Sequence, residues 1–347
     1  MDVPQKNTRP TLKEIAKYTG FGLSTVSLAL RNDPKLRKTT GDSIREAAQR
    51  LGYVPNPLVS ALMTQVRNKR VTRSARIALI SRLKHGVTRS SSQNIFYSSL
   101  YQSIVKHAES RGFGIDEFYL GCDKLSDARL ADILKARGIH GILLFPGSHD
   151  PKIEYPELPW GRFSTVLIGH NTLQNKLHQV VPDYSFNIDC ALDHTQAQGE
   201  TKIGFAVTRA VNQATNRHWS SRFLLYQNSI SKRHRVPMLL SESDSNFRSE
   251  LVGWYHKYRP EVLLIAGEGA HRLLVRNGVR IPDDVQLVNL VQRGEVGLAG
   301  IAPNTDQVGH VAVEFLVSLL ETNKSGLPPV PQTIAIKGHW RDGPSFL

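Results

Sequence analysis

Three short helical patterns follow one another near the start of the chain, and their spacing strongly limits how these residues can fold. Thr11 and Glu14 form a capping box ahead of the first pattern, because each side chain can bond the backbone N–H of the other residue. Gly20 ends this pattern, since the left-handed position after a helix suits glycine. A second pattern covers residues 23–31, and a third covers about 40–51. The sequence therefore predicts a small all-α module.

The first two helical patterns carry the spacing of a helix-turn-helix. Ala16, Gly20 and Val26 stand at successive offsets of 4 and 6 residues. A small residue lets two helices approach, a glycine makes the turn, and a β-branched residue fills the crossing. We therefore expect the second helix to lie in the major groove of DNA and to present side chains to base edges.

Basic residues are concentrated in the same part of the chain. Residues 1–76 hold 15 of the 44 Lys and Arg residues but only 5 of the 30 Asp and Glu residues. A solvated basic tail has a similar balance, but an ordered helical pattern inside the basic segment favours a module that binds polyanions. Each phosphate that such a module neutralises releases condensed counterions. Double-stranded DNA is the expected partner.

Two leucines of the second helix are open to two interpretations. Leucines at helical spacing usually belong to a core, which would place Leu23 and Leu28 inside the module. Val26, Ala29 and Leu30 already form an inward stripe, however, and this favours outward leucines that pack on thymine methyl groups. The candidate base-reading residues are Leu23, Ser24, Thr25, Ser27 and Leu28.

A further short helix is predicted over residues 57–66, with Asn56 as its N-cap and Pro57 at its first position. The segment is too short to persist alone in water. It either packs on the preceding module or becomes ordered on DNA, with Leu62 wedged between base pairs in the minor groove. The basic residues that follow predict a linker beside phosphates, and they are Arg67, Lys69, Arg70, Arg73 and Arg76.

The run TLKEIAKYTGFGLSTVSLALRND, together with IREAAQRLGYVPNPLVSAL, resembles the lactose/galactose-repressor family of bacterial transcription factors. The resemblance implies a headpiece over residues 1–57 and a hinge helix with a basic linker over residues 58–74. Gly22 stands where the family's helix-capping serine is usual. Arg37 replaces a common serine before the third helix, so we expect that helix's N-cap to shift to Thr39 or Thr40. The resemblance implies DNA contacts by Thr11, Gly22, Leu23, Ser24, Thr25, Ser27, Leu28, Arg31, Tyr53, Asn56, Val59 and Leu62.

From Ala75 onward, short apolar runs alternate with helical patterns, which predicts parallel sheets covered on both faces. About nine or more strands suit two adjacent doubly wound α/β subdomains. Their order resembles the periplasmic-binding-protein-like body of the same family, so an effector-binding and dimerisation body is expected over residues 75–347. One subdomain is expected to comprise about 75–171 with 303–332, and the other about 172–302 with 333–347.

The resemblance also points to a ligand site in this body. The family's ligand-binding Asn-Asp pair aligns with Gly267 and Glu268. Around RHWSSRFLL the register is ambiguous and leaves either Arg217 or Trp219 for the pocket. A pocket without the family's sugar-gripping groups is expected to bind another small molecule or nothing, and sugars come first on family grounds. The candidate effector-binding residues are Arg217, Trp219 and Glu268.

The sequence gives only weak support for cofactor binding, catalysis or metal binding. Gly267 opens a GxG pattern, but Arg272 replaces the third glycine of a dinucleotide fingerprint, so no cofactor is predicted. The 13 histidines form no HExxH and no serine sits in GxSxG, so we expect no catalytic residue and no metal site. A doubly wound α/β enzyme and a solute-binding protein with a basic N-terminal module are the alternative interpretations.

The start of the chain has no apolar stretch for a signal peptide, and no later run is long enough to span a bilayer. We therefore expect a cytoplasmic protein that reaches the nucleoid through operator binding, with no membrane partner. Cys122 and Cys190 have no CxxC partner and are expected to be buried small hydrophobes. The resemblance predicts a homodimeric repressor on a near-palindromic operator, modulated by a small-molecule effector. Activation in place of repression, and a tetramer in place of a dimer, remain open.

Overall fold

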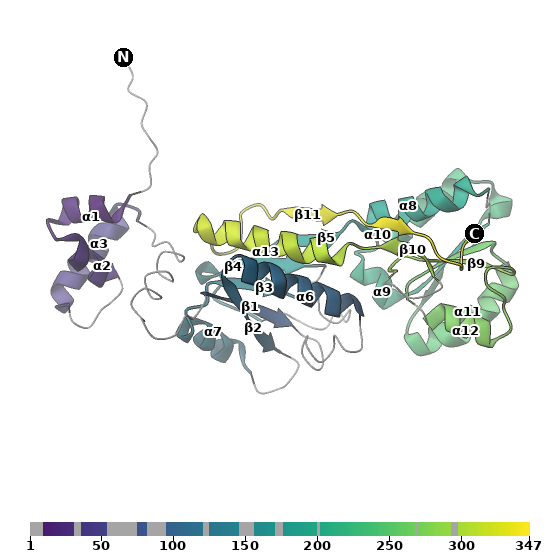
Figure 1. The fold of residues 1–347 in the computed structure, drawn as a ribbon, viewed down its shortest axis with the longest axis horizontal. Coiled ribbons are helices and arrows are strands. Elements are labelled where there is room, and N and C mark those ends of the chain that lie inside the picture. Colours follow the sequence, from purple (N-terminus) through teal and green to yellow (C-terminus); the bar gives the residue numbers. More distant parts are fainter. Residues whose placement is uncertain are drawn as a thin grey trace, which may run out of the picture. The chain divides into compact units, whose positions relative to one another are not determined.

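The computed structural model describes residues 10–30, 36–53, 75–81, 95–120, 125–145, 156–170, 176–199, 202–267, 269–292 and 298–347. The chain forms two compact units, and Figure 1 labels the elements of each. The smaller unit contains residues 1–73, and we call its described part the headpiece; the larger unit contains residues 74–319 and 325–347, and we call it the body. None of the helices in these ranges combines the length and apolar character needed to cross a bilayer.

The headpiece consists of three helices, α1 (Leu12–Thr19), α2 (Leu23–Leu30) and α3 (Lys38–Arg50). The predicted capping box is confirmed, because the Glu14 N–H donates to Thr11 Oγ1 at 3.4 Å and the Glu14 carboxylate accepts from the Thr11 N–H. Gly20 follows α1 with a φ of +73°, the left-handed conformation expected of it. Local sequence signals therefore determine where the first helix begins and ends.

The start of α3 differs from the prediction. The helix begins at Lys38, so Thr39 and Thr40 lie inside its first turn and neither is the N-cap. The N-cap is Arg37, which makes no side-chain capping hydrogen bond. An arginine has no side-chain oxygen to accept from the first N–H groups of the helix, so packing has to hold this end in place.

A compact core explains why three short helices are stable together. Ile15 of α1, Val26 and Ala29 of α2, and Ile44 and Ala48 of α3 are buried against one another. The predicted inward stripe of the second helix is confirmed, because Val26 and Ala29 belong to this cluster and Leu30 packs against it. Partly buried apolar side chains surround it, namely Leu12, Ala16, Leu30, Leu36, Leu51 and Tyr53.

The body contains two separate sheets. All described pairs of the first sheet are parallel, in the order β11-β5-β4-β3-β1-β2. Its strands are β1 (Ala75–Ser81), β2 (Phe113–Tyr119), β3 (Gly141–Leu144), β4 (Ser164–Ile168), β5 (His178–Pro182) and β11 (Thr333–Ile336). The helices of this half are α6 (Ile95–Ser110), α7 (Asp127–Ala136), α13 (Thr305–Glu321) and the 3-10 turn η1 (Trp160–Arg162).

The second sheet has the order β12-β10-β9-β8-β6-β7 and is parallel except for the pair β10 and β12. Its strands are β6 (Ile203–Thr208), β7 (Leu239–Ser241), β8 (Val262–Ile265), β9 (Gln286–Asn289), β10 (Ala299–Ala302) and β12 (His339–Arg341). Its helices are α8 (Tyr184–Ala197), α9 (Arg209–Ala214), α10 (His218–Ser229), α11 (Asp244–Tyr258), α12 (Gly269–Arg276) and the 3-10 turn η2 (Lys232–His234).

Both faces of each sheet are covered, as predicted. In the second sheet, Phe205 of β6 packs with α8 and α10, whereas its neighbour Ala206 packs with α11 and α12. In the first sheet, Ala78 and Ile80 of β1 pack with α7. Figure 1 shows α6 and α13 side by side along that sheet, and the Ser103 hydroxyl of α6 donates to the Asp306 carbonyl of α13 at 2.6 Å. The doubly wound α/β class is therefore confirmed.

The strand pairing differs from the subdomain boundaries expected from the sequence. β5 and β11 lie in the first sheet, whereas the sequence predicts residues 172–182 and 333–336 to lie in the second subdomain. β5 pairs in parallel with β4, and β11 pairs in parallel with β5, so the first subdomain extends through Pro182 and again through Ile336. Both strands are short, and β11 alternates exposed and half-buried residues, which gives no continuous apolar run.

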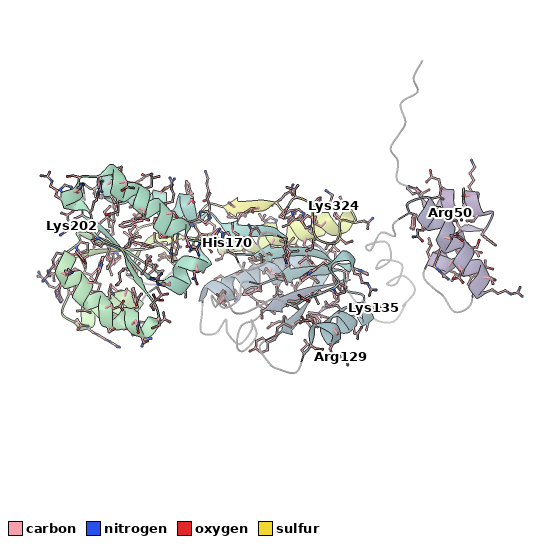
Figure 2. All side chains as sticks on the ribbon, turned by 180° about the vertical axis from the view of Figure 1, so that it is seen from behind. Arg50, Arg129, Lys135, His170, Lys202 and Lys324 are labelled. Carbon is pink, nitrogen blue, oxygen red and sulfur yellow. The ribbon has the colours of Figure 1, made fainter. Side chains whose placement is uncertain are left out.

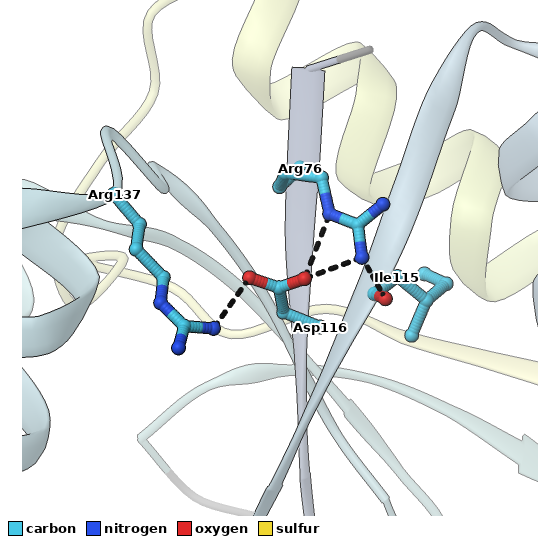
Figure 3. Close-up of polar contacts among 4 residues, drawn as sticks. All are labelled: Arg76, Ile115, Asp116 and Arg137. Carbon is cyan, nitrogen blue, oxygen red and sulfur yellow. Dashed lines mark hydrogen bonds and ion pairs between the residues drawn. The ribbon is translucent and has the colours of Figure 1, made fainter. Parts of the chain in front are cut away.

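Arg76 is also placed differently from the prediction, which put it in the basic linker. It belongs to β1 and is part of an ion-pair network with β2, the edge strand of the sheet (Figure 3). Asp116 accepts from Arg76 Nε at 2.7 Å and from Arg137 Nη1 at 2.9 Å. Burial alone would raise the pKa of Asp116, but the hydrogen bonds from both arginines lower it below its usual value.

Replacing Asp116 by asparagine should destabilise the body at neutral pH by about 1 kcal/mol, the upper range for exposed ion pairs. A carboxyl whose pKa is lower in the folded chain stabilises the fold above its unfolded pKa of about 3.9, and that contribution disappears as the pH falls through the folded value. The difference between variant and wild type should therefore shrink between about pH 5 and pH 3 in urea titrations. Asp132→Asn, at an exposed position of α7, is the control. An Asp116→Asn penalty of the same size at both ends of this range would contradict the prediction.

Candidate nucleic-acid interface and ligand site

One face of α2 is turned away from the headpiece core. Leu23 is 47% exposed, Ser24 is exposed, and Ser27 and Leu28 are half-buried. Leu23 and Leu28 both lie outside the core cluster that holds Val26 and Ala29. Neither leucine is a core residue, so the outward placement expected of them agrees with the structure, and their packing on thymine methyl groups stays a prediction.

An arginine holds α2 against α3. Arg45 Nη1 donates to the Ala29 carbonyl at 2.9 Å, and the same guanidinium is paired with Asp42. A carboxyl-terminal carbonyl of α2 is thus satisfied by a cation, which the helix dipole favours. Gly41 leaves room for this arginine, because a Cβ at that position would lie 3.1 Å from Arg45 Nη1. Sequence reasoning missed Arg45, since no motif marks a contact between residues 29 and 45.

The other predicted DNA-contacting residues divide into two groups. Thr11 is exposed at the start of α1, Gly22 precedes α2 and accepts from the Val26 N–H at 3.0 Å, and Thr25 is half-buried. Tyr53 packs against the headpiece core, and burial raises its pKa. Four predicted residues lie outside the described part of the chain, namely Arg31, Asn56, Val59 and Leu62.

A cluster of aromatic and imidazole side chains forms in the body near the carboxyl end of β4. His170 follows this strand, and its ring lies 5.8 Å from that of Tyr184 and 5.9 Å from that of His218. His218 Nδ1 is 2.8 Å from the hydroxyl of Ser185. Figure 2 shows His170 where the first sheet meets the helices of the second half. Ligands of parallel α/β proteins bind at the carboxyl ends of strands, so this is the candidate ligand site.

The two alternative residues for the effector pocket, Arg217 and Trp219, lie in different environments. Trp219 is 1% exposed and packs in the core of the second sheet, with its ring 5.7 Å from Tyr184 in an edge-on arrangement. Arg217 is exposed just before α10, with a φ of +62°. Glu268, the third candidate, lies outside the described residues. Its neighbour Gly267 donates its N–H to Asn289 Oδ1 at 2.9 Å.

Two buried polar atoms of the second half of the body have no partner among the described residues. They are the indole Nε1 of Trp219 and the side-chain oxygen of Asn212 on α9, the helix that directly follows β6. A buried donor or acceptor without a partner costs about 1–3 kcal/mol. A polar ligand or water at this end of β6 would remove that cost. Neither atom is marked as special by the sequence pattern.

Three stretches of chain connect the two halves of the body, and hydrogen bonds tie them together. The Asp183 N–H donates to the Ile336 carbonyl at 2.8 Å, and Asn304 Nδ2 donates to the Lys337 carbonyl at 2.7 Å. The buried Asn187 accepts from the Gly338 N–H at 2.8 Å. A side chain at Gly338 would collide with the Asn187 side chain at 2.7 Å, so glycine is required at this crossing.

The described part of the body contains few groups that could bind a metal ion or react. No group of three or more His, Cys, Asp or Glu residues there is arranged to hold a metal ion. Cys190 is half-buried on α8 and not fully buried as expected, because the helix places it at the margin of the core. Burial raises the pKa of its thiol. Cys122 lies outside the described residues.

Comparisons with known proteins agree with the two-part organisation. The family model described as "Bacterial regulatory proteins, lacI family" matches residues 11–56. The chain is 23% identical to the HTH-type transcriptional regulator PtxS of Pseudomonas plecoglossicida over 91% of each chain. It is also 23% identical to the NTD biosynthesis operon regulator NtdR of Bacillus subtilis, over 80% of this chain and 82% of the relative.

Solved structures share the fold at lower sequence identity. The transcriptional regulator CelR in complex with cellobiose has a TM-score of 0.59 and 17% identity, and the match covers 97% of this chain and 100% of that one. The lac repressor dimer bound to operator and the anti-inducer ONPF has a TM-score of 0.57 and 16% identity, over 98% and 100% of the two chains. These matches show that the chain shares its fold with both structures.

Proposed function

Because the chain belongs to the lacI family of bacterial regulatory proteins, we propose that it is a sequence-specific DNA-binding regulator of transcription. The observation that carries this proposal is the complete helix-turn-helix, in which Val26 and Ala29 anchor α2 and its opposite face stays open. The named relatives are transcriptional regulators rather than enzymes. We infer accordingly that the chain acts as a regulator without catalysing a reaction, and that it works in the cytoplasm.

The regulator is proposed to bind a near-palindromic operator as a homodimer. Each α2 would enter a major groove, and residues 57–66 of the two copies would form hinge helices that open the central minor groove with Leu62. A twofold symmetric protein requires a matching symmetry in its site. The lac repressor, which shares the fold, is described as a dimer bound to operator. Repression is the expected sign of regulation.

A small-molecule effector is proposed to bind at the cluster around His170, Tyr184 and His218. Side chains from both halves meet there, so a ligand that contacts both would favour one relative position of the halves. The hydrogen-bonded crossings at Asp183, Asn304 and Gly338 would serve as the hinge. The effector would change operator affinity by the difference in its own affinity for the two positions. Sugars deserve the first trial, because CelR is described in complex with cellobiose and another lacI-type regulator in complex with lactose.

The proposal is tested by selecting bound sites from random duplex DNA with the purified full-length chain at physiological salt. We expect enrichment of a site with two related half-sites, and an affinity at least a thousandfold above that for bulk competitor. Repeating the measurement with candidate sugars tests the effector. Recovery of unrelated sequences without enrichment would refute sequence-specific binding.

A further inference from the structure

The segment of the headpiece that is proposed to face DNA carries no charged side chain. Residues 20–30 read GFGLSTVSLAL, without Lys, Arg, Asp, Glu, Asn or Gln. Inside α2, Leu23, Ser24, Ser27 and Leu28 share one arc of the helix, because their positions are i, i+1, i+4 and i+5. Two apolar side chains therefore bracket two hydroxyl groups on the face opposite the core. Phe21, 37% exposed in the turn, extends the apolar part of this surface.

This composition limits which bases α2 can distinguish. Guanine is most often recognised by two hydrogen bonds from Arg or Lys, and adenine by two from Asn or Gln. None of these residue types is present between Gly20 and Leu30. Serine and threonine hydroxyls bond to several bases, so they discriminate weakly. An exposed leucine, in contrast, gains free energy only where it can bury an apolar group, and the major groove offers one such group, the thymine methyl.

We propose that the regulator reads each half-site mainly through thymine methyl groups, one packed against Leu23 and one against Leu28, and that α2 recognises no guanine. This inference rests on the proposed function and adds to it the class of operator. Leu23 is already 47% exposed while the core beneath it is closed, so docking on a methyl group requires no rearrangement of the headpiece. The positive charge of the chain then supplies affinity through phosphates, and the leucines supply the sequence preference.

The test removes single methyl groups from the DNA. In the operator selected with the full-length chain, each thymine is replaced in turn by deoxyuridine, which keeps every hydrogen-bonding group. We expect binding to weaken about fourfold at two positions of each half-site, as for one buried methyl group, and to be unchanged elsewhere. Leu23→Ala should abolish the effect at one of these positions, and Leu28→Ala at the other.

Leu327→Ala is the matched control, because Leu327 lies in the body and has the same 47% exposure as Leu23. This variant should retain the full response to deoxyuridine. A gain-of-function variant, Leu28→Arg, should select guanine at the position where Leu28→Ala abolishes the effect of deoxyuridine. Specific binding with no response to deoxyuridine, or guanine at the strongest positions of the wild-type site, would overturn this inference and leave the proposed function standing. A failure to select any site would overturn both.

Discussion

Replacing Val26 by aspartate should reduce operator affinity by about a thousandfold or more, to the level of non-specific binding. Val26 has no exposed surface and belongs to the same headpiece core cluster as Ile15 of α1 and Ile44 of α3. An unpaired carboxylate at such a site costs about 3–5 kcal/mol. A domain of this size rarely has more than about 3–5 kcal/mol of stability, so the headpiece should unfold. The body should remain folded, because its cores consist of other residues.

The measurement combines operator binding with calorimetry of the full-length chain. Val26→Asp should lose specific binding while the unfolding transition of the body keeps its midpoint. Ser43→Asp is the control, since it adds the same charge at an exposed position of α3, where the carboxylate stays in water. Specific binding by Val26→Asp at near wild-type affinity would show that α2 does not need this core.

The headpiece was largely predictable because its signals are local. Thr11 and Glu14 are three residues apart, and Gly20 ends α1 through its own backbone conformation. The N-cap of α3 was not predictable from such signals. A threonine inside the first turn resembles a cap in the sequence, but Ile44 and Ala48 fix the position of α3 through contacts with α2.

The body was predictable as a fold class and less so in its connections. Runs such as VLLI and IGFAVT are buried throughout and therefore appear as continuous apolar stretches. Which of the two sheets β5, β11 and β12 join depends on pairing partners far away in the sequence. The terminal residues illustrate this, because the Ser345 hydroxyl donates to the Leu287 carbonyl at 2.8 Å and accepts from the Ala299 N–H at 2.8 Å.

The location of the candidate ligand site was predictable from the sequence, but the residues that form it were not. Its general place, at the carboxyl ends of parallel strands, follows from the fold class. The residues that gather there do not, because His170 and His218 belong to different halves of the body and approach only in the folded chain. The same holds for Asn187. Its side chain accepts a hydrogen bond from the Gly338 N–H, and this contact between distant parts of the sequence forms only in the folded chain.

Replacing Gly300 by alanine should unfold the second sheet, at a cost of about 4 kcal/mol or more. Gly300 lies on β10 beside Asn289 of β9, with a φ of +148° that side chains rarely adopt. A Cβ at this position would overlap the Asn289 carbonyl oxygen and lie 2.7 Å from the Asn289 nitrogen. These are backbone atoms of the neighbouring strand, so the collision is relieved only if β9 and β10 separate. The side chain of Asn289, which accepts from the Gly267 N–H, would move with them.

Gly253→Ala is the matched control, and its expected effect on the stability of the body has the opposite sign. Gly253 is exposed on α11, and a Cβ there meets no atom within 4 Å. The same substitution should therefore stabilise the body by about 0.5–1 kcal/mol, because alanine is the better helix former. Urea titrations of both variants measure the two effects, and proteolysis should cut Gly300→Ala within residues 202–302. Because the headpiece core is separate, that variant should still bind non-specific DNA but lose any response to an effector. Equal midpoints for the two variants would mean that β10 is not held against β9 as the structure has it.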